Sequence, residues 1–338
     1  MKKALKIATV YIGLVIGAGF ASGREILEYF NFRSNTNISG VLIAAFLFMI
    51  IAYLILAKSS EEGISDFDSY ITSVAGRTAP LVRGFMLVYM FCGLFVMFSG
   101  SGALTDSLSL LPDFYGSVLM ALICFAILSF DLRGIVTLNL ILVPLMICGI
   151  IFVSVCTAIF SDIAVFSPTE YINGGVMISA VCYATYNTVT AGAVLVPLAK
   201  DLSIKTIRAA AVGGGFCIGF LIMLVWTVQG ASFDLIHDSE LPMLTLAALC
   251  GKLCKRVYTA VLFMAICTTA VSYGFGLMSH FSDKIKTSRQ RVLFSAVLCL
   301  TALPFSLYGF SNLVSQLYSA FGYIGMIWIV MVIVDKYR

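Results

Sequence analysis

Long apolar stretches separated by short polar clusters dominate the sequence. A helix needs about 20 apolar residues to cross the hydrocarbon core of a bilayer. Ten stretches of roughly this kind lie between the charge and turn clusters, at residues 7–31, 38–57, 81–105, 115–130, 135–160, 174–199, 208–229, 256–279, 291–308 and 310–334. The pattern predicts an all-α integral membrane protein with ten transmembrane helices in a single domain over residues 1–338.

Composition supports this prediction. Of the 338 residues, 60% are hydrophobic and only 11% are charged, which is too few charges to cover a water-soluble domain of this length. We therefore expect the lipid bilayer as surroundings, and we expect neither nucleic-acid binding nor soluble enzyme chemistry. No organic cofactor is expected, and the oligomeric state stays open.

The distribution of lysine and arginine tests the number of spans, because loops that stay in the cytoplasm retain positive charge. With the N-terminus inside, most of the 21 Lys and Arg residues fall on the inner side, whereas Arg33, Lys252, Lys255 and Arg256 fall outside. Nine spans remain an alternative, since the last two stretches meet at Tyr308-Gly309-Phe310, but nine would put the positive C-terminal end outside. We expect a multi-pass protein of the cytoplasmic membrane with both termini in the cytoplasm.

The ten spans divide into two halves of five, residues 7–160 and 174–334. An odd number of spans per half makes the second half enter the membrane from the opposite face, so two similar halves would be inverted repeats. The first span of each half is interrupted at a corresponding place, at 17–23 and at 186–192. We therefore predict a 5+5 inverted repeat with discontinuous helices 1 and 6.

Paired breaks predict a central binding site, because unwound backbone within a membrane must be satisfied by protein, ligand or water. The helix start near Ala21, Ser22 and Gly23 would offer N–H groups to a carboxylate, and carbonyls near Gly13 and Ile16 would bind a cation. The alternative reading of each single glycine is a helix-packing position.

Span 8 places adjacent hydroxyls at mid-membrane, in the run Ala265-Ile266-Cys267-Thr268-Thr269. A hard monovalent cation such as sodium takes several oxygen ligands, which two hydroxyls and the carbonyls of a broken helix would supply. The alternative is that each threonine donates to a carbonyl of its own helix.

These motifs resemble a known superfamily. The Ile16-to-Phe20 sequence, the Tyr-Asn break of span 6 and the Ala-x-x-Thr-Thr of span 8 are similar to the amino acid-polyamine-organocation superfamily, which has the five-plus-five fold of the bacterial leucine/sodium symporter. The run GAGFASGREILEYF and the chain length resemble more closely the YkvI-like proteins, regarded as amino-acid permeases of unproven substrate.

The resemblance implies a set of site residues. It implies a sodium site formed by carbonyls and hydroxyls of Gly13, Ile16, Ala265, Thr268 and Thr269. It implies solute contacts from Gly17, Ala18, Gly19, Tyr183, Tyr186 and Asn187, to which Phe20 could add an apolar wall. Some superfamily members replace the sodium with a lysine of span 5, but residues 135–160 contain none.

The resemblance also implies gates. On the cytoplasmic side Asp283 could pair with a lysine ahead of span 1. On the outer side Arg24 and Glu25 follow the break, and Arg24 can pair with Glu28 one turn later. Span 10 contains no Asp or Glu to serve as the usual acidic partner. The rival role for Glu25 is to accept a proton in a proton-coupled carrier. A helix within 233–255 could cover the outer side as a lid.

The sequence therefore predicts a sodium-coupled symporter of a small amino acid or related compound, working by alternating access. A neutral solute is expected because no uncompensated acid or base is evident deep in the spans. Two alternatives stay open, a proton-coupled permease and a receptor subunit that binds a ligand on the same fold without transporting it. An intramembrane enzyme has less support, since no catalytic cluster is evident. A channel has less support because helices broken at glycines suit occlusion of a solute better than continuous conduction.

Overall fold

The computed structural model describes residues 2–30, 38–108, 112–130, 139–160, 174–200, 202–281 and 285–336. Every regular element in these ranges is helical. The long helices are α4 (Ile38–Glu61), α6 (Ala79–Ser107), α7 (Asp113–Ser129), α9 (Asn139–Phe160), α10 (Gly174–Leu198), α11 (Ile204–Ala231), α14 (Lys252–His280), α15 (Ser288–Ser306) and α17 (Ser319–Lys336). The shorter ones are α1 (Lys2–Val15), α2 (Ala18–Ser22), α3 (Arg24–Tyr29), α5 (Phe67–Ala75), η1 (Gly76–Thr78), α12 (Phe233–Ile236), α13 (Pro242–Leu249), α16 (Phe310–Leu313) and the π-helical η3 (Val314–Tyr318).

Helices lie on all ten predicted stretches. Within the described ranges, 6 helices are long and apolar enough to cross a membrane by themselves, and the bent α10 makes a seventh. The three remaining stretches are the interrupted first one, the 17-residue α7 and the 19-residue α15.

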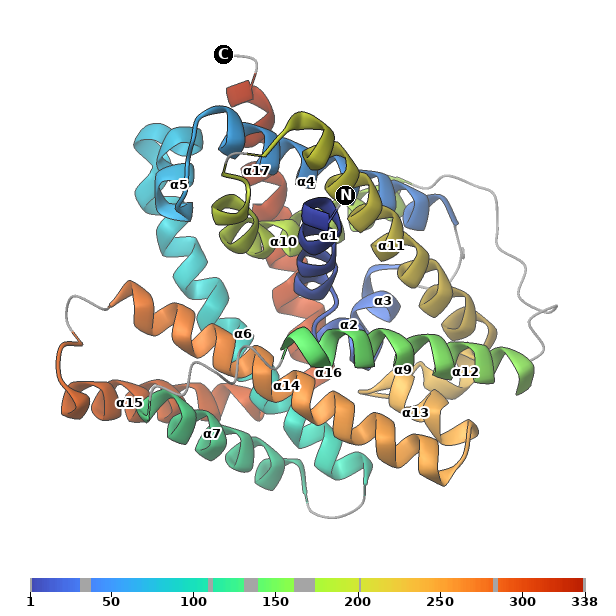
Figure 1. The fold of residues 1–338 in the computed structure, drawn as a ribbon. Helices are drawn as coiled ribbons and strands as arrows, with labels where there is room; N and C mark the ends of the chain where they lie inside the picture. Colours follow the sequence, from blue (N-terminus) through green and yellow to red (C-terminus); the bar gives the residue numbers. More distant parts are fainter. Residues whose placement is uncertain are drawn as a thin grey trace.

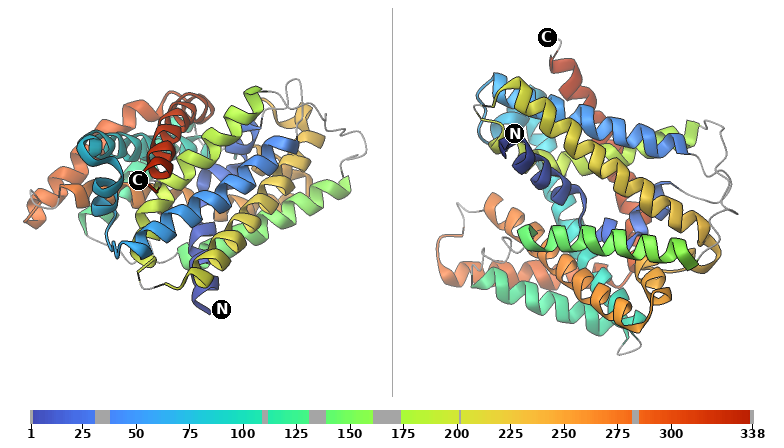
Figure 2. Two further views of the ribbon diagram at one scale, coloured as in Figure 1. Left: turned by 90° about the horizontal axis from the view of Figure 1, so that it is seen from above. Right: turned by 45° about the vertical axis from the view of Figure 1, so that its right-hand side comes forward.

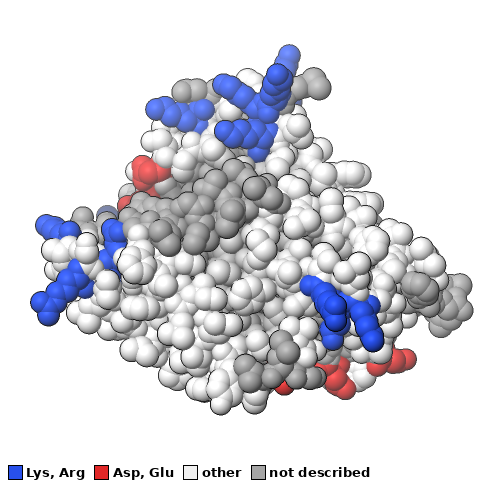
Figure 3. All heavy atoms as spheres, turned by 60° about the horizontal axis from the view of Figure 1, so that its bottom comes forward, with Lys and Arg blue, Asp and Glu red and all other residues white. Residues whose placement is uncertain are grey.

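The surface fits a bilayer. Large apolar side chains such as Phe46, Phe216, Phe220 and Leu293 are exposed, and such a continuous apolar surface marks contact with lipid or protein. In Figure 3 one basic group lies inside the outline at the lower right, the other charged side chains lie toward the margins, and the broad area between them is uncharged. The chain is a multi-pass membrane protein.

The interrupted segment α1–α2–α3 runs from the surface, where Leu5 of α1 is exposed, into the helix bundle, where α2 is buried (Figure 1). α1 packs against α10 and α11, and α2 packs against α13 and α14. Further out, α4 lies beside α11 and α7 beside α15, as the right-hand view of Figure 2 shows. The packing therefore surrounds the first break with helices from the second half of the chain.

The first break has a clear cause in the backbone. The Gly17 amide donates to the Val15 carbonyl at 3.0 Å instead of to the carbonyl of Gly13, four residues earlier, so the helix stops. α2 then starts at Ala18, with Gly17 extended. A second turn follows at Gly23, whose φ of 80° is costly for any residue with a side chain.

The predicted break in the sixth span takes a different form. Helix α10 runs through residues 186–192 without unwinding, and its two parts, Gly175–Thr188 and Thr190–Leu198, are bent by 49°. Threonine hydroxyls compete for carbonyls along this stretch, since Thr188 donates to the carbonyls of Ala184 and Thr185. Such back-bonding bends helices without breaking them.

Residues 233–255 form the predicted short helix. α13 begins at Pro242, and the Ser239 hydroxyl accepts a hydrogen bond from the Leu241 amide at 3.2 Å. Met243 and Leu246 are buried, whereas Leu249 and Leu253 are exposed. The helix thus covers the bundle with its first turns, at the opposite end of the molecule from α5 (Figure 1).

Candidate functional site

A cavity of about 360 Å³ lies at the first break. Its walls come from α1, α2, α6, α10, α14 and η3, and Glu25 reaches it from α3. This volume falls within the usual range for small-molecule sites. On one side the lining continues to Phe67, Met86 and Val194, so the cavity extends toward the end of the molecule that carries α5.

The structure gathers many of the predicted site residues around this cavity. The lining includes Gly13, Gly17, Ala18, Gly19, Tyr186, Asn187 and Thr269. Five others are buried but do not line it, namely Ile16, Phe20, Tyr183, Ala265 and Thr268. Arg24 lies outside the cavity, and Asp283 lies outside the described residues.

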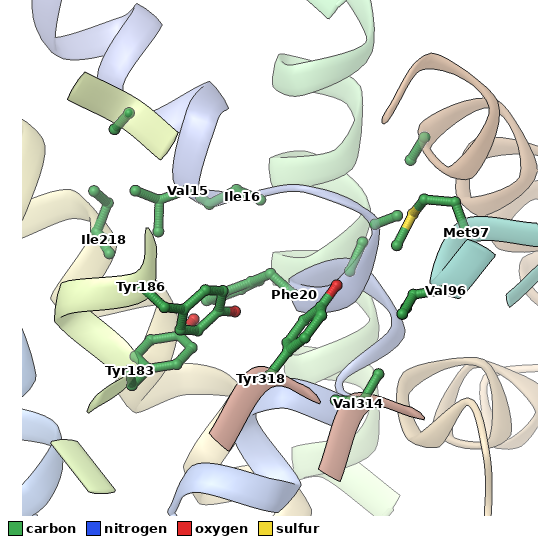
Figure 4. Packing of buried hydrophobic residues seen from close by; sticks show 14 of the residues in the cluster. Val15, Ile16, Phe20, Val96, Met97, Tyr183, Tyr186, Ile218, Val314 and Tyr318 are labelled. Carbon is green, nitrogen blue, oxygen red and sulfur yellow. The ribbon is translucent and has the colours of Figure 1, made fainter. Parts of the chain in front are cut away.

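Aromatic rings form one wall. The rings of Tyr29 and Tyr186 stack with centroids 5.5 Å apart, and Tyr318 lies 5.1 Å from Tyr186. Figure 4 shows Tyr183, Tyr186 and Tyr318 below the Val15–Ile16 end of α1. Tyr183 is the outer layer, since its ring packs edge-on against Phe48.

The predicted cation ligands are partly assembled. Loss of the Gly17 donor leaves the Gly13 carbonyl without its usual helical partner. Thr269 Oγ1 lies 4.0 Å from the position that a Cβ would take at Gly17, so span 8 meets the break there. The Thr268 hydroxyl donates to the Ala265 carbonyl at 3.2 Å, which engages its proton and leaves its oxygen lone pairs as possible ligands.

The backbone amides that the sequence predicts as donors to a solute carboxylate already donate hydrogen bonds within the protein. The amides of Ala21 and Gly23 donate to the carbonyls of Gly17 and Phe20, and the Arg24 amide donates to the Ser22 hydroxyl. These donors are engaged because α2 begins at Ala18, earlier than the sequence indicates. The unsatisfied first-turn amides of this half-helix therefore belong to residues 18–20.

Glu25 is the most unexpected feature of the cavity. The sequence places it in an outer gate, yet its carboxylate folds back onto α2, where a Cβ at residue 19 would lie 2.6 Å from Glu25 Cδ. The side chain lines the cavity and is 5% exposed, and its Oε2 has no hydrogen-bond partner among the described residues. An uncompensated acid thus lies deep in the bundle, contrary to the expectation from sequence.

Arg24 points away from Glu25. Its Nη1 donates to the Ser239 carbonyl at 3.3 Å and its Nη2 to Glu28 Oε2 at 3.5 Å, so the expected Arg24–Glu28 pair is present. The other oxygen of Glu28 accepts a hydrogen bond from the Ser315 hydroxyl of η3 at 2.7 Å. These contacts tie α3 to the segment before α13 and to span 10.

Sequence reasoning missed two side chains, Tyr258 and Gln229, that hold the break by hydrogen bonds to its backbone; we call this pair the clamp. The Tyr258 hydroxyl donates to the Ala21 carbonyl at 2.6 Å, and Gln229 Nε2 donates to the Gly23 carbonyl at 2.8 Å. Both side chains are buried, and they lie in helices whose sequences otherwise predict ordinary transmembrane helices. A polar residue within an apolar helix is the one signal that could have found Gln229.

The sequence comparisons identify relatives in Bacillus subtilis (strain 168). The uncharacterized membrane protein YkvI is 26% identical over 338 residues, covering 96% of this chain and 94% of YkvI. The uncharacterized protein YyaD is 22% identical over 334 residues, covering 96% and 94%. No family model matches the chain. The resemblance to the YkvI-like proteins is thereby confirmed.

Solved structures show the fold. The inward-facing conformation of Mhp1 matches with a TM-score of 0.65 at 12% identity, over 97% of this chain and 75% of Mhp1. The Eremococcus coleocola manganese transporter, in complex with an aromatic bis-isothiourea substituted compound, gives 0.62 at 14%, over 98% and 78%. A Na+-coupled sialic acid symporter in a substrate-bound outward-open state gives 0.57 at 14%, over 96% and 76%. The chain therefore shares the fold of these membrane transporters.

Proposed function

We propose that this protein is a sodium-coupled secondary transporter of a small amino acid or related compound, working by alternating access. The observation that carries the proposal is the cavity at the first break, lined by α10 and α14 and by the residues that the sequence singled out for solute and ion. Unwound backbone is tolerated at membrane depth where it lines such a site.

The proposal includes the ten-span inverted repeat. If the halves are related by a pseudo-two-fold axis, equivalent helices should meet near it. α1 packs against α10, α4 against α11, α6 against α14 and α7 against α15, and in each pair the second helix is the counterpart five spans later. This pairing supports the 5+5 arrangement over nine spans.

The proposed state is open to the cytoplasm. The cavity extends toward α5, which lies in a segment assigned to the inside by its arginines. At the other end Arg24 holds the segment before α13, and the Tyr29 hydroxyl donates to the Tyr318 carbonyl at 2.5 Å. If the protein lies in the cytoplasmic membrane with both termini in the cytoplasm, these contacts close the cavity on the outer side. Arg24 then serves as a gate residue.

Sodium would be held by the carbonyls of Gly13, Ile16 and Ala265 and by the hydroxyls of Thr268 and Thr269. The Gly13 carbonyl has lost its helical donor, and Thr269 lies at the cavity wall. A monovalent cation fits this neutral set of oxygens, and its binding would couple the two halves of span 1 to span 8.

The test is uptake by the purified protein in liposomes. Pooled radiolabelled amino acids and the amines formed by their decarboxylation are offered with an inward sodium gradient, and an equal potassium gradient is the reference. The double substitution Thr268→Ala/Thr269→Ala should abolish sodium-dependent uptake. Thr301→Ala, on the exposed face of α15, should not. Equal uptake in sodium and potassium would contradict sodium coupling.

Glu25 favours one second candidate, a proton-coupled permease. A buried carboxylate at the solute site can take up and release a proton as the cavity changes sides. The distinguishing condition is an inward pH gradient without sodium in the same liposomes. Accumulation under that gradient, lost in Glu25→Gln, would establish proton coupling in place of sodium coupling.

A further inference from the structure

Glu25 is a buried carboxylate that the protein itself leaves without compensation. Within the part of the chain that the structure describes, its Oε2 has no hydrogen-bond partner, and its side chain is 5% exposed. An ionised carboxylate in such surroundings is costly unless it meets a positive group. Among the described residues that line the cavity, none is a lysine, arginine or histidine. A positively charged solute would supply the missing group, whereas a proton would neutralise the carboxylate instead.

The nearest cationic side chain in sequence cannot supply that charge. Arg24 precedes Glu25 directly, but its guanidinium donates to the Ser239 carbonyl and to Glu28. Successive residues of a helix point in different directions, so Arg24 faces the outer closure while Glu25 faces the cavity. This geometry keeps the Glu25 carboxylate available to a solute.

The surroundings of Glu25 suit an organic ammonium group. Tyr89, Tyr186, Tyr273 and Tyr318 line the same cavity, and the faces of aromatic rings attract cations. The hydroxyl of Tyr186 faces the Glu25 carboxylate, and among the described residues neither this hydroxyl nor Glu25 Oε2 has a partner at full hydrogen-bond distance. Two acceptors without partners match the several N–H donors of a primary ammonium better than a cation that has none.

The position of the Glu25 carboxylate also affects whether the solute can carry a carboxylate of its own. Glu25 lies against Gly19 in the first turn of α2, which is where a solute carboxylate would meet the unsatisfied amides. Two carboxylates at one place repel each other strongly in a dry site. The protein thus fills with its own acid the subsite that a zwitterion would need.

Resting on the transport function proposed above, we infer that Glu25 and the cavity tyrosines form a binding site for a primary ammonium group. The preferred solute is a small organic amine with a net positive charge rather than a zwitterionic amino acid. Gly19 is the positioning residue of this site, because a side chain there would displace the Glu25 carboxylate.

The experiment measures binding to the purified protein by calorimetry. The probes are three amines, ethanolamine, isopentylamine and phenethylamine, each paired with the amino acid that differs only by a carboxylate, namely serine, leucine and phenylalanine. Isopentanol replaces the ammonium by a hydroxyl. At least one amine should bind about tenfold or more tightly than its amino acid, and isopentylamine should exceed isopentanol.

Variants assign the effect to the site. Glu25→Gln should remove the preference for amines, and Tyr186→Phe, which keeps the ring, should weaken it. Glu61→Gln removes an exposed carboxylate at the end of α4 and should change nothing. If Glu25→Gln does not fold, Glu25→Asp retains the charge on a shorter side chain and should weaken amine binding at unchanged thermal stability.

Two results would overturn the inference. One is that no amine binds more tightly than its amino acid, which includes the case in which no amine binds at all. The other is amine binding that survives Glu25→Gln. The transport proposal and the ammonium site can be contradicted independently of each other. Glu25-dependent amine binding without uptake in liposomes contradicts transport alone, and amino-acid uptake that is indifferent to Glu25 contradicts the ammonium site alone.

Discussion

The carboxylate of Glu25 and the backbone of Gly19 lie in direct contact, with Glu25 Cδ 2.6 Å from the place of a Cβ at residue 19. Only a residue without a side chain leaves room for that carboxylate. One glycine of the first break thus positions an acid in the cavity, in addition to interrupting the helix.

Gly19→Ala should therefore impair the solute site. The added methyl would push the Glu25 carboxylate away from α2, and we expect solute affinity to fall about tenfold or more, since misplaced charged groups commonly cost more than 1.4 kcal/mol. Binding and initial uptake rates measure the effect. Gly84→Ala, whose Cβ would meet nothing within 4 Å, is the matched control. Full activity of Gly19→Ala would show that the contact has no role.

Arg24→Ala should loosen the outer closure. The change removes the bonds to the Ser239 carbonyl and Glu28, so the segment before α13 should open more often. Amide hydrogen exchange over 232–249 should become faster by roughly fivefold or more, equivalent to about 1 kcal/mol of lost closure. Arg77→Ala, an exposed arginine of η1, is the control. Unchanged exchange would mean that Arg24 does not hold this end.

Tyr258→Phe should destabilise the break. The substitution keeps the ring but removes the 2.6 Å hydrogen bond to the Ala21 carbonyl, leaving a buried acceptor unpaired. We expect a loss of about 1–2 kcal/mol in unfolding free energy, seen as a lower melting temperature in detergent. The exposed Tyr115→Phe should melt like the parent protein. Equal melting of the two variants would argue against the clamp.

Stability should also depend on pH through Glu62, which follows α4. Burial alone would raise the pKa of this carboxyl, but hydrogen bonds from the Lys58 ammonium and the Ser73 hydroxyl outweigh burial and hold the pKa below its ordinary value of 4.5. A lowered pKa in the folded state contributes stability above pH 4.5 that is lost as the pH falls further.

The melting temperature of the parent protein should therefore drop below pH 4.5 more steeply than that of Glu62→Gln. The glutamine variant has no carboxyl to protonate at this position, so its curve isolates the other acids. Parallel curves for the two proteins would contradict the assignment. Lys58 also contacts Asp335 of α17, and Asp335→Asn removes this competing carboxylate, so it should not reduce the difference between the curves.

Much of the fold follows from the sequence because apolar length and glycine placement are local signals. The break at Gly17 appears where the glycines predict it, and Arg24 and Glu28 pair as their spacing indicates. The bend of α10 was expected as an unwound segment, since sequence shows the polar run but not that Thr188 bonds to its own helix.

The interior of the site was less accessible to sequence reasoning. Glu25 reads as a residue of the outer vestibule, because the direction of its side chain depends on the turn at Gly23 and on the space above Gly19. Tyr318 joins the cavity through the π-helical turn of span 10, whose extra residue per turn shifts the helix face. Such rotations depend on tertiary packing.

The central claim is that the cavity carries its solute across the membrane, and counterflow tests it most directly. Liposomes containing the protein are loaded with an unlabelled amine or amino acid that binds, and are diluted into the same labelled compound with sodium equal on both sides. A carrier predicts a transient accumulation of label above the equilibrium level, absent from protein-free liposomes. Specific binding of the compound without any counterflow would contradict the claim and favour a ligand-sensing receptor.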